Sequence, residues 1–255
     1  MYIAMRGMRD TAVAKLPARF TVLYAWVFMV GLGSLLFHAT LKWSMQLLDE
    51  IPMIYMASHI LHCLLYPNDK DFKSAPWWRK SCLPAYGVSV AVSLAYAANQ
   101  NPIFHQVCFG GLLLGCVLAY PSFAASSTRG LADAKAVKHE AFGLFLRAAM
   151  LMLTAFGIWN IDNVACAHLR SIREFLESRH LMFWMSPCLQ FHAIWHMLTT
   201  AAADYMVVGV VYMWCQGQRS RRAASASGSL EIEIQNKIFG AFPQILITRS
   251  KARRK

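Results

Sequence analysis

The chain has 255 residues, of which 57% are hydrophobic and only 15% are charged, whereas a soluble domain has about 45–50% apolar and about 25% charged residues. The net charge is +12, but the basic residues lie between apolar blocks and at the C-terminal end, which indicates membrane topology rather than nucleic-acid binding. The 7 cysteines are scattered without CxxC spacing, which excludes a zinc finger or a disulfide scaffold. The composition therefore predicts an all-α membrane protein with several transmembrane helices.

Six apolar blocks are long enough to cross a bilayer as helices, which requires at least about 17 residues. Backbone hydrogen bonds must be satisfied within lipid, and the blocks lack the alternation of barrel strands, so helices are expected. In chain order the blocks are 20–41, 47–66, 82–98, 103–125, 141–161 and 187–215. We therefore predict a cytosolic N-terminal segment at 1–19, a six-span membrane domain at 20–215 and a disordered, basic cytosolic tail at 216–255.

The distribution of Lys and Arg predicts the orientation in the membrane. Basic residues are concentrated in 1–19, 67–81 and 126–140, which all fall on one side of the predicted bilayer, and few lie on the other side. By the positive-inside rule both termini are expected in the cytosol. Within the fourth block, Gly111 and Gly115 form a GxxxG motif, which predicts close helix packing there.

Ionisable residues inside predicted spans are candidate functional residues, because lipid does not solvate them. His192 and His196 are one turn apart in FHAIWH, a spacing that lets two imidazoles on one helix face bind one metal ion. Ser34 and His38 have the same spacing, and Asp49 follows eleven residues after His38. At about 1.5 Å of helical rise per residue, all five lie in the outer third of the bilayer on the non-cytosolic side.

Each of these residues also has a structural interpretation, which the residues alone leave open. A histidine within a span often makes a hydrogen bond between helices, and Asp49 and Glu50 are acids that favour a helix N-terminus. His59 and His62 fall nearer the middle or the cytosolic half of the bilayer. For that pair the structural interpretation is preferred.

Three histidines, an acid and a serine at one depth predict zinc-dependent hydrolysis. Zn²⁺ held by three histidines keeps one tetrahedral position open for water, which is the arrangement of catalytic sites. Asp49 would act as the general acid and base, and Ser34 would donate a hydrogen bond to the developing oxyanion. Because the site lies within the membrane, the expected substrate is a lipid with an amide or ester near the headgroup level.

Three segments of the sequence resemble the alkaline ceramidase family, which belongs to a superfamily of seven-helix membrane zinc hydrolases that also includes the adiponectin receptors. They are GLGSLLFHATLKWSMQLLDEIPMIY at Gly31–Tyr55, WNIDN at Trp159–Asn163 and FHAIWHMLT at Phe191–Thr199. The resemblance implies that Zn²⁺ is bound by His38, His192 and His196, with Asp49 as the acid and base and Ser34 as the oxyanion partner.

The same resemblance implies a substrate, a location and a departure from the family. The substrate would be ceramide, dihydroceramide or phytoceramide, cleaved to a sphingoid base and a fatty acid in the endoplasmic reticulum or Golgi membrane. Family members have an additional first span preceded by a calcium-binding stretch, and Met1–Ala4 resembles the last turn of that span. We therefore expect six of the seven spans and no calcium-site residues. Trp159, Asn160 and Asp162 match the family pattern as structural or pocket-lining residues.

Two other functions compete with hydrolysis. A receptor-like or pseudoenzyme member would keep zinc as a structural element, but such a site needs neither Asp49 nor Ser34. A metal-ion transporter would need ionisable residues along the whole depth of the bilayer, and only His59 and His62 favour it.

Overall fold

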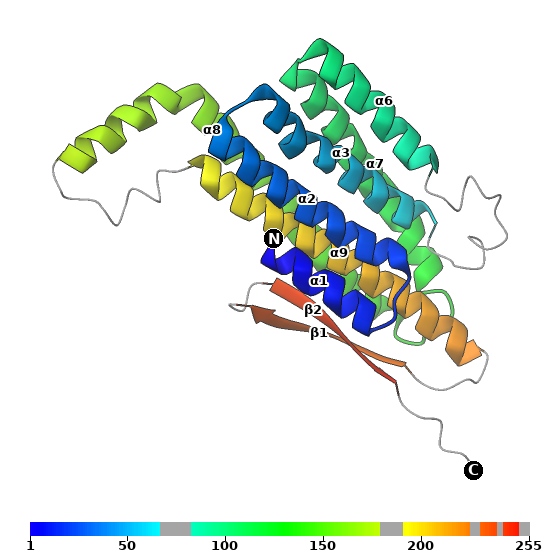
Figure 1. Ribbon diagram of the computed structural model, residues 1–255. Coiled ribbons are helices and arrows are strands. Elements are labelled where there is room, and N and C mark those ends of the chain that lie inside the picture. The colour runs from blue at the N-terminus through cyan, green and yellow to red at the C-terminus, as the bar shows by residue number, and fades with distance from the viewer. Residues whose placement is uncertain (67–82, 179–190, 225–229, 239–241, 250–255) are drawn as a thin grey trace. The chain divides into compact units, whose positions relative to one another are not determined.

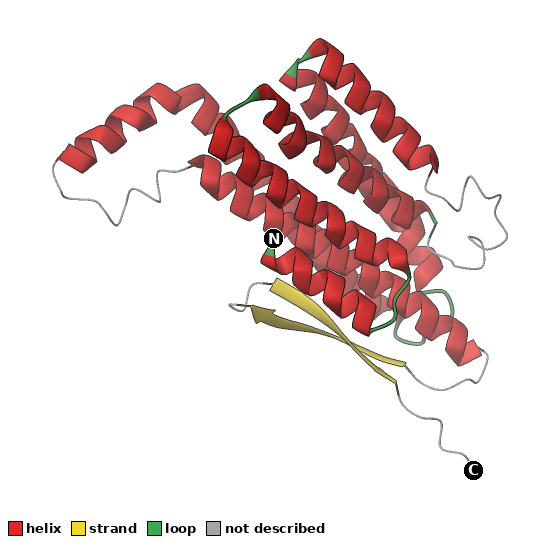
Figure 2. Ribbon diagram, in the orientation of Figure 1, coloured by secondary structure: helices red, strands yellow, loops and turns green. Residues whose placement is uncertain are grey.

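The computed structural model of the protein describes residues 1–66, 83–178, 191–224, 230–238 and 242–249. Within these residues the chain is helical up to residue 224 and ends in a two-stranded sheet (Figures 1 and 2). The elements are α1 (Tyr2–Val13), α2 (Ala18–Thr40), α3 (Trp43–Leu65), α6 (Leu83–Asn99), α7 (Pro102–Ser127), α8 (Ala134–Ser178), α9 (Phe191–Ala224), β1 (Leu230–Ile238) and β2 (Phe242–Arg249). The predicted all-α membrane fold is confirmed.

Each of the six predicted apolar blocks coincides with one helix from α2 to α9. Four of these helices, α2, α7, α8 and α9, are long and apolar enough to cross a membrane by length and composition among the described residues. The number of six spans stays a prediction. The basic connection predicted at 67–81 and the first residues of the last block, 187–190, lie outside the described residues.

Helix α8 is much longer than the predicted span at 141–161, since it runs over 45 residues. The apolar block predicts only the part of the helix that is apolar enough to lie in lipid. The flanking residues are polar but include many Ala, Lys, Glu, Leu and Arg residues, which have high helix propensity. The helix therefore continues beyond the apolar block at both ends.

The tail at 216–255, for which we expected mostly disorder, contains regular structure among its described residues. Helix α9 continues through Ala224, and β1 pairs with β2 in a two-stranded sheet. The segment Leu230-Glu231-Ile232-Glu233-Ile234 alternates apolar and charged residues, and this period of two, with β-branched isoleucines, favours a strand. The prediction of disorder was based on the overall composition of the tail, which does not show this local pattern.

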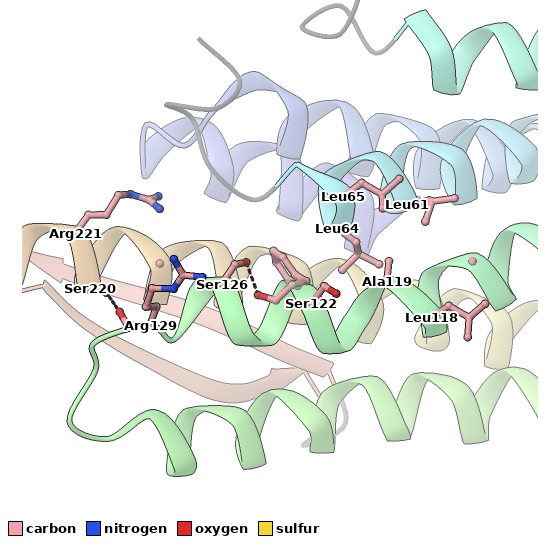
Figure 3. A pocket seen from close by; sticks show the side chains of 13 residues that line it. Leu61, Leu64, Leu65, Leu118, Ala119, Ser122, Ser126, Arg129, Ser220 and Arg221 are labelled. Atoms are coloured by element: carbon pink, nitrogen blue, oxygen red, sulfur yellow. Dashed lines mark hydrogen bonds between the residues drawn. The ribbon is translucent and has the colours of Figure 1, made fainter. Parts of the chain in front are cut away.

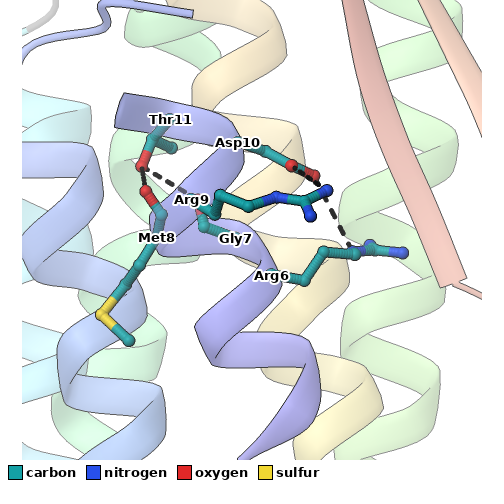
Figure 4. Close-up of polar contacts among 6 residues, drawn as sticks. All are labelled: Arg6, Gly7, Met8, Arg9, Asp10 and Thr11. Atoms are coloured by element: carbon teal, nitrogen blue, oxygen red, sulfur yellow. Dashed lines mark hydrogen bonds and ion pairs between the residues drawn. The ribbon is translucent and has the colours of Figure 1, made fainter. Parts of the chain in front are cut away.

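The N-terminal segment forms more than the single helical turn that the resemblance implied, because α1 extends to Val13 and packs against α2. Gly7 makes this approach close, since a Cβ at this position would overlap the Tyr24 ring. The Thr11 hydroxyl lies 2.9 Å from the carbonyl oxygens of Gly7 and Met8 and 3.0 Å from the Thr21 hydroxyl on α2. Figure 4 shows the contacts of Thr11 with Gly7 and Met8, together with the nearby Arg6–Asp10 ion pair, whose N–O distance is 3.9 Å.

Contacts divide the chain into two units. The first consists of Met1–Ala141, Val207–Gln235 and Gln244–Lys255, and the second consists of Phe142–Met206 and Asn236–Pro243. Within the first unit, α2 packs against α1 and α3, and α3 packs against α6 and α7. Helix α3 is thus the centre of this unit, and most of its residues from Pro52 to Leu64 are buried.

Candidate metal centre

Helices α2 and α3 bring Ser34 and Asp49 to the same level because the connection between the helices is very short. Only Leu41 and Lys42 separate α2 from α3, and Leu41 has a left-handed backbone with φ 54°. Ser34 lies seven residues before Leu41, and Asp49 lies seven residues after Lys42. Both are therefore roughly 10 Å of helical rise from the connection.

The two helices approach each other closely at Gly33 and Leu48. A Cβ on Gly33 would overlap the carbonyl group of Leu48 and lie close to the backbone nitrogen of Asp49. Pro52 lies four residues after Leu48 and has no N–H to donate, so the Leu48 carbonyl lacks its helical hydrogen bond. Glycine on one helix and proline on the other thus allow the backbones to meet beside Asp49.

This close approach joins the two side chains that the sequence places in acid–base and oxyanion roles. Asp49 is buried, with 8% of the residue's surface exposed, and the Ser34 hydroxyl hydrogen-bonds to its carboxyl group. His38 lies one turn after Ser34 in the last turn of α2. The first unit therefore holds three of the five predicted site residues within two turns of α2 and the facing part of α3.

The second unit holds the other two predicted residues at the start of α9. His192 and His196 are one turn apart, with ring centroids 4.9 Å from each other and ring planes at 66°. The rings therefore project from one helix face, as the FHAIWH spacing predicts. Imidazole nitrogens arranged in this way are suitable ligands for a borderline metal ion such as Zn²⁺.

Asp162 on α8 faces His192 within the same unit, and the sequence did not reveal this contact. The distance from Asp162 Oδ2 to His192 Nδ1 is 3.7 Å. The tryptophans three residues from each of these, Trp159 on α8 and Trp195 on α9, also pack together with ring centroids 6.1 Å apart. The separation of Asp162 and His192 is an ion-pair distance, and a carboxylate near one imidazole nitrogen leaves the other nitrogen available for a metal.

The predicted ligands come from both units. One unit supplies His38, and the other supplies His192 and His196. In each unit the chemistry of the donor set fits Zn²⁺. The first unit carries a histidine one turn from the serine of an acid–serine pair, and the second carries two histidines at ligand spacing with a carboxylate near one of them.

Two other histidines are engaged in contacts between helices. The Nδ1 atom of His59 lies 2.7 Å from the Tyr86 hydroxyl on α6, and Nε2 of His105 lies 2.9 Å from the Glu50 carbonyl on α3. The His59 ring also lies edge-on to the His62 ring, with ring centroids 6.4 Å apart. These hydrogen bonds agree with the structural interpretation preferred for His59.

The fold and its polar residues define the class of protein, a polytopic helical membrane protein with a candidate metal site. Comparison with known proteins then gives the family. The family model described as Ceramidase matches residues 1–231. The chain belongs to the ceramidase family.

Curated relatives agree with this assignment. The chain is 34% identical over 196 residues to alkaline ceramidase 3 of Mus musculus, a match that covers 77% of this chain and 65% of the relative. It is 27% identical over 209 residues to the alkaline ceramidase YPC1 of Saccharomyces cerevisiae, covering 78% and 63%. A putative alkaline ceramidase of Dictyostelium discoideum, dcd3B, is 27% identical over 203 residues, covering 76% and 64%. The chain thus spans just under two thirds of the length of these relatives.

Proposed function

We propose that the protein is a zinc-dependent amide hydrolase that cleaves ceramide, dihydroceramide or phytoceramide to a sphingoid base and a free fatty acid. The observation that carries this proposal is the buried Asp49 hydrogen-bonded to Ser34 in a chain of the ceramidase family. A structural metal site needs neither an acid nor a hydroxyl beside it. The pair therefore favours catalysis over a receptor-like member with structural zinc.

Zn²⁺ would be held by His38, His192 and His196, with Asp162 orienting the His192 ring. When bound there, the ion would supply the Lewis acidity that activates water and polarises the amide carbonyl. The proposal rests on the predicted common depth of the three histidines, on the ring geometry of His192 and His196 and on the Asp162–His192 contact.

Asp49 and Ser34 would move the protons and stabilise charge. Asp49 takes a proton from the attacking water and passes it to the nitrogen of the amide as the C–N bond breaks, which releases the sphingoid base as an amine and the fatty acid as a carboxylic acid. Once Asp49 is protonated it accepts less strongly from Ser34. The Ser34 hydroxyl can then donate to the amide oxygen, where negative charge develops.

The substrate and the location follow from the membrane setting. A site within the helices of a membrane protein receives its substrate from the bilayer, and the alkaline ceramidases that this chain resembles point to a ceramide. We place the protein in the endoplasmic reticulum or Golgi membrane, with both termini in the cytosol. The charge distribution and the resemblance support this placement.

The test is release of sphingoid base from a panel of ceramides by the purified full chain in detergent micelles, with zinc content measured on the same samples. His196→Ala should lose both zinc and hydrolysis, whereas Asp49→Asn should lose hydrolysis and keep zinc. His168→Ala is the matched control, because His168 is an exposed histidine of the same unit. Stoichiometric zinc without turnover of any ceramide in the wild type would favour the structural-zinc alternative.

A further inference from the structure

A cavity of the first unit lies between α3, α7 and the end of α9, and neither Ser34 nor Asp49 lines it. Its volume is about 960 Å³, which is within the range of about 300–1,000 Å³ found for small-molecule sites. Its lining on α7 runs from Gly115 to Ser126, which corresponds to roughly 16 Å along the helix. None of the residues that the proposed hydrolysis uses lines it.

Two close contacts between helices bound this cavity. At one level a Cβ on Gly115 of α7 would lie 3.2 Å from Leu61 Cδ2 on α3, so the helices touch there. At the other level a Cβ on Gly217 of α9 would lie 3.6 Å from the Cα atom of Ser127. Helix α7 is thus contacted by α3 towards one end of the cavity and by α9 towards the other, and the space between these contacts remains open.

The lining of the cavity changes in chemistry along its length. Leucines and small residues of α3 and α7 form one end, including Leu61, Leu65, Leu118 and Ala119, and two arginines, Arg129 and Arg221, are gathered at the other end (Figure 3). The described lining residues include no acidic side chain. Asp133, the acid that follows Arg129 in the chain, forms an ion pair with Arg219 at 2.7 Å.

Hydrogen bonds hold the polar end in place. The Ser220 hydroxyl on α9 donates to the Arg129 carbonyl, which ties the connection after α7 to α9. The Ser126 hydroxyl donates to the Phe123 carbonyl at 2.9 Å. The backbone that carries Arg129 is therefore tied to α9, the helix that carries Arg221, so the two arginines line the same end of the cavity.

We propose that this cavity binds one anionic phospholipid, with its phosphate at Arg129 and Arg221 and an acyl chain along the leucines. Paired guanidinium groups match a phosphate, which they bind through several N–H donors at once. A free phosphate would make no use of the apolar end, and ceramide is neutral and would make no use of the arginines. The positive-inside prediction places this end at the cytosolic leaflet, whose surface carries anionic lipids.

The experiment measures phospholipid binding by the full, delipidated chain in detergent micelles, using native mass spectrometry. The probes are phosphatidylserine and phosphatidylcholine with identical acyl chains. We expect one phosphatidylserine per chain, bound at least about tenfold more tightly than phosphatidylcholine. The double variant Arg129→Gln/Arg221→Gln should bind phosphatidylserine about 30-fold more weakly, the equivalent of about 1 kcal/mol for each basic residue near an anionic lipid.

Two further variants separate the charge of the cavity from its shape. Lys135→Gln/Lys138→Gln removes the same charge from exposed positions at the start of α8, outside the cavity lining, and should change the affinity by less than about threefold. Ala119→Trp fills the apolar end and should weaken binding with both arginines intact. If the arginine variant fails to fold, phosphatidylserine binding by Ala119→Trp still tests whether the lipid occupies this cavity.

Three results would overturn the proposal. The first is equal affinity of the wild type for the two phospholipids, and the second is equal loss of binding in the lysine and arginine variants. The third is displacement of phosphatidylserine by inorganic phosphate or by oleate at concentrations comparable to its own, which would mean that the cavity binds a simple anion or a fatty acid.

Discussion

Replacing Gly33 with alanine tests whether the close approach of α2 and α3 positions the Ser34–Asp49 pair. The added Cβ would overlap the backbone of Leu48, and backbone cannot rotate away as a flexible side chain can. Overpacking of this kind costs about 1–3 kcal/mol, and the upper end applies here. For a chain of this size about 3 kcal/mol corresponds to a fall in Tm of roughly 6–12 °C.

The assay is thermal unfolding in detergent, followed by ceramide hydrolysis below the Tm of both proteins. Gly110→Ala is the matched control, because a Cβ at Gly110 meets no described atom within 4 Å and alanine is favoured over glycine in a helix by about 1 kcal/mol. The control should keep or raise the Tm, whereas Gly33→Ala should lower it and reduce hydrolysis at temperatures where it is folded. Equal Tm and activity in the two variants would refute the packing argument.

Two further predictions concern the site. Asp162→Asn should weaken zinc binding 10- to 100-fold, as loss of an orienting carboxylate does. The control Asn163→Ala, on the exposed side of the same turn, should not change it. Unchanged zinc affinity of the Asp162 variant in a metal titration would show that Asp162 does not orient His192. Ser34→Ala should lower kcat about 10²- to 10³-fold with zinc content unchanged. The control Thr40→Val should retain activity, because the Thr40 hydroxyl bonds only the Leu36 carbonyl among the described contacts. Full kcat in the Ser34 variant would show that Ser34 does not stabilise the oxyanion.

Hydropathy predicted the positions of the membrane helices well, because every helix that crosses lipid needs a long run of apolar residues. The first block at 20–41 corresponds to α2 at Ala18–Thr40, and the block at 103–125 corresponds to α7 at Pro102–Ser127. Hydropathy could not predict where α8 ends, since beyond the lipid the helix depends on propensity. The same limit explains the missed strands β1 and β2, whose alternating pattern is local and short.

Packing and polar contacts were harder to predict, because they depend on which helix faces meet. The GxxxG spacing indicated close packing at Gly111 and Gly115, yet only Gly115 has a described neighbour, Leu61, within 4 Å of its Cβ position. A close backbone approach instead involves Gly33, which has no such motif. Asp162 likewise matched the family pattern, but the sequence did not reveal its contact with His192, because the two residues are thirty positions apart.

The predicted depth of the residues in the bilayer was more informative than any single motif. This depth puts Ser34 and Asp49 at one level, and the structure joins them by a hydrogen bond. It also predicts that His38 shares a metal ion with His192 and His196, which stays a prediction.

X-ray absorption at the zinc edge, measured on the purified full chain, tests this central claim most directly. The account predicts one zinc ion per chain with three imidazole nitrogens at about 2.0–2.1 Å, and His38→Ala should lower the number of imidazole ligands to two or release the metal. His139→Ala, an exposed histidine of the same unit, should leave the spectrum unchanged. A zinc site whose imidazole count is the same in wild type and His38→Ala, or a fully folded wild-type chain that binds no zinc, would contradict the account.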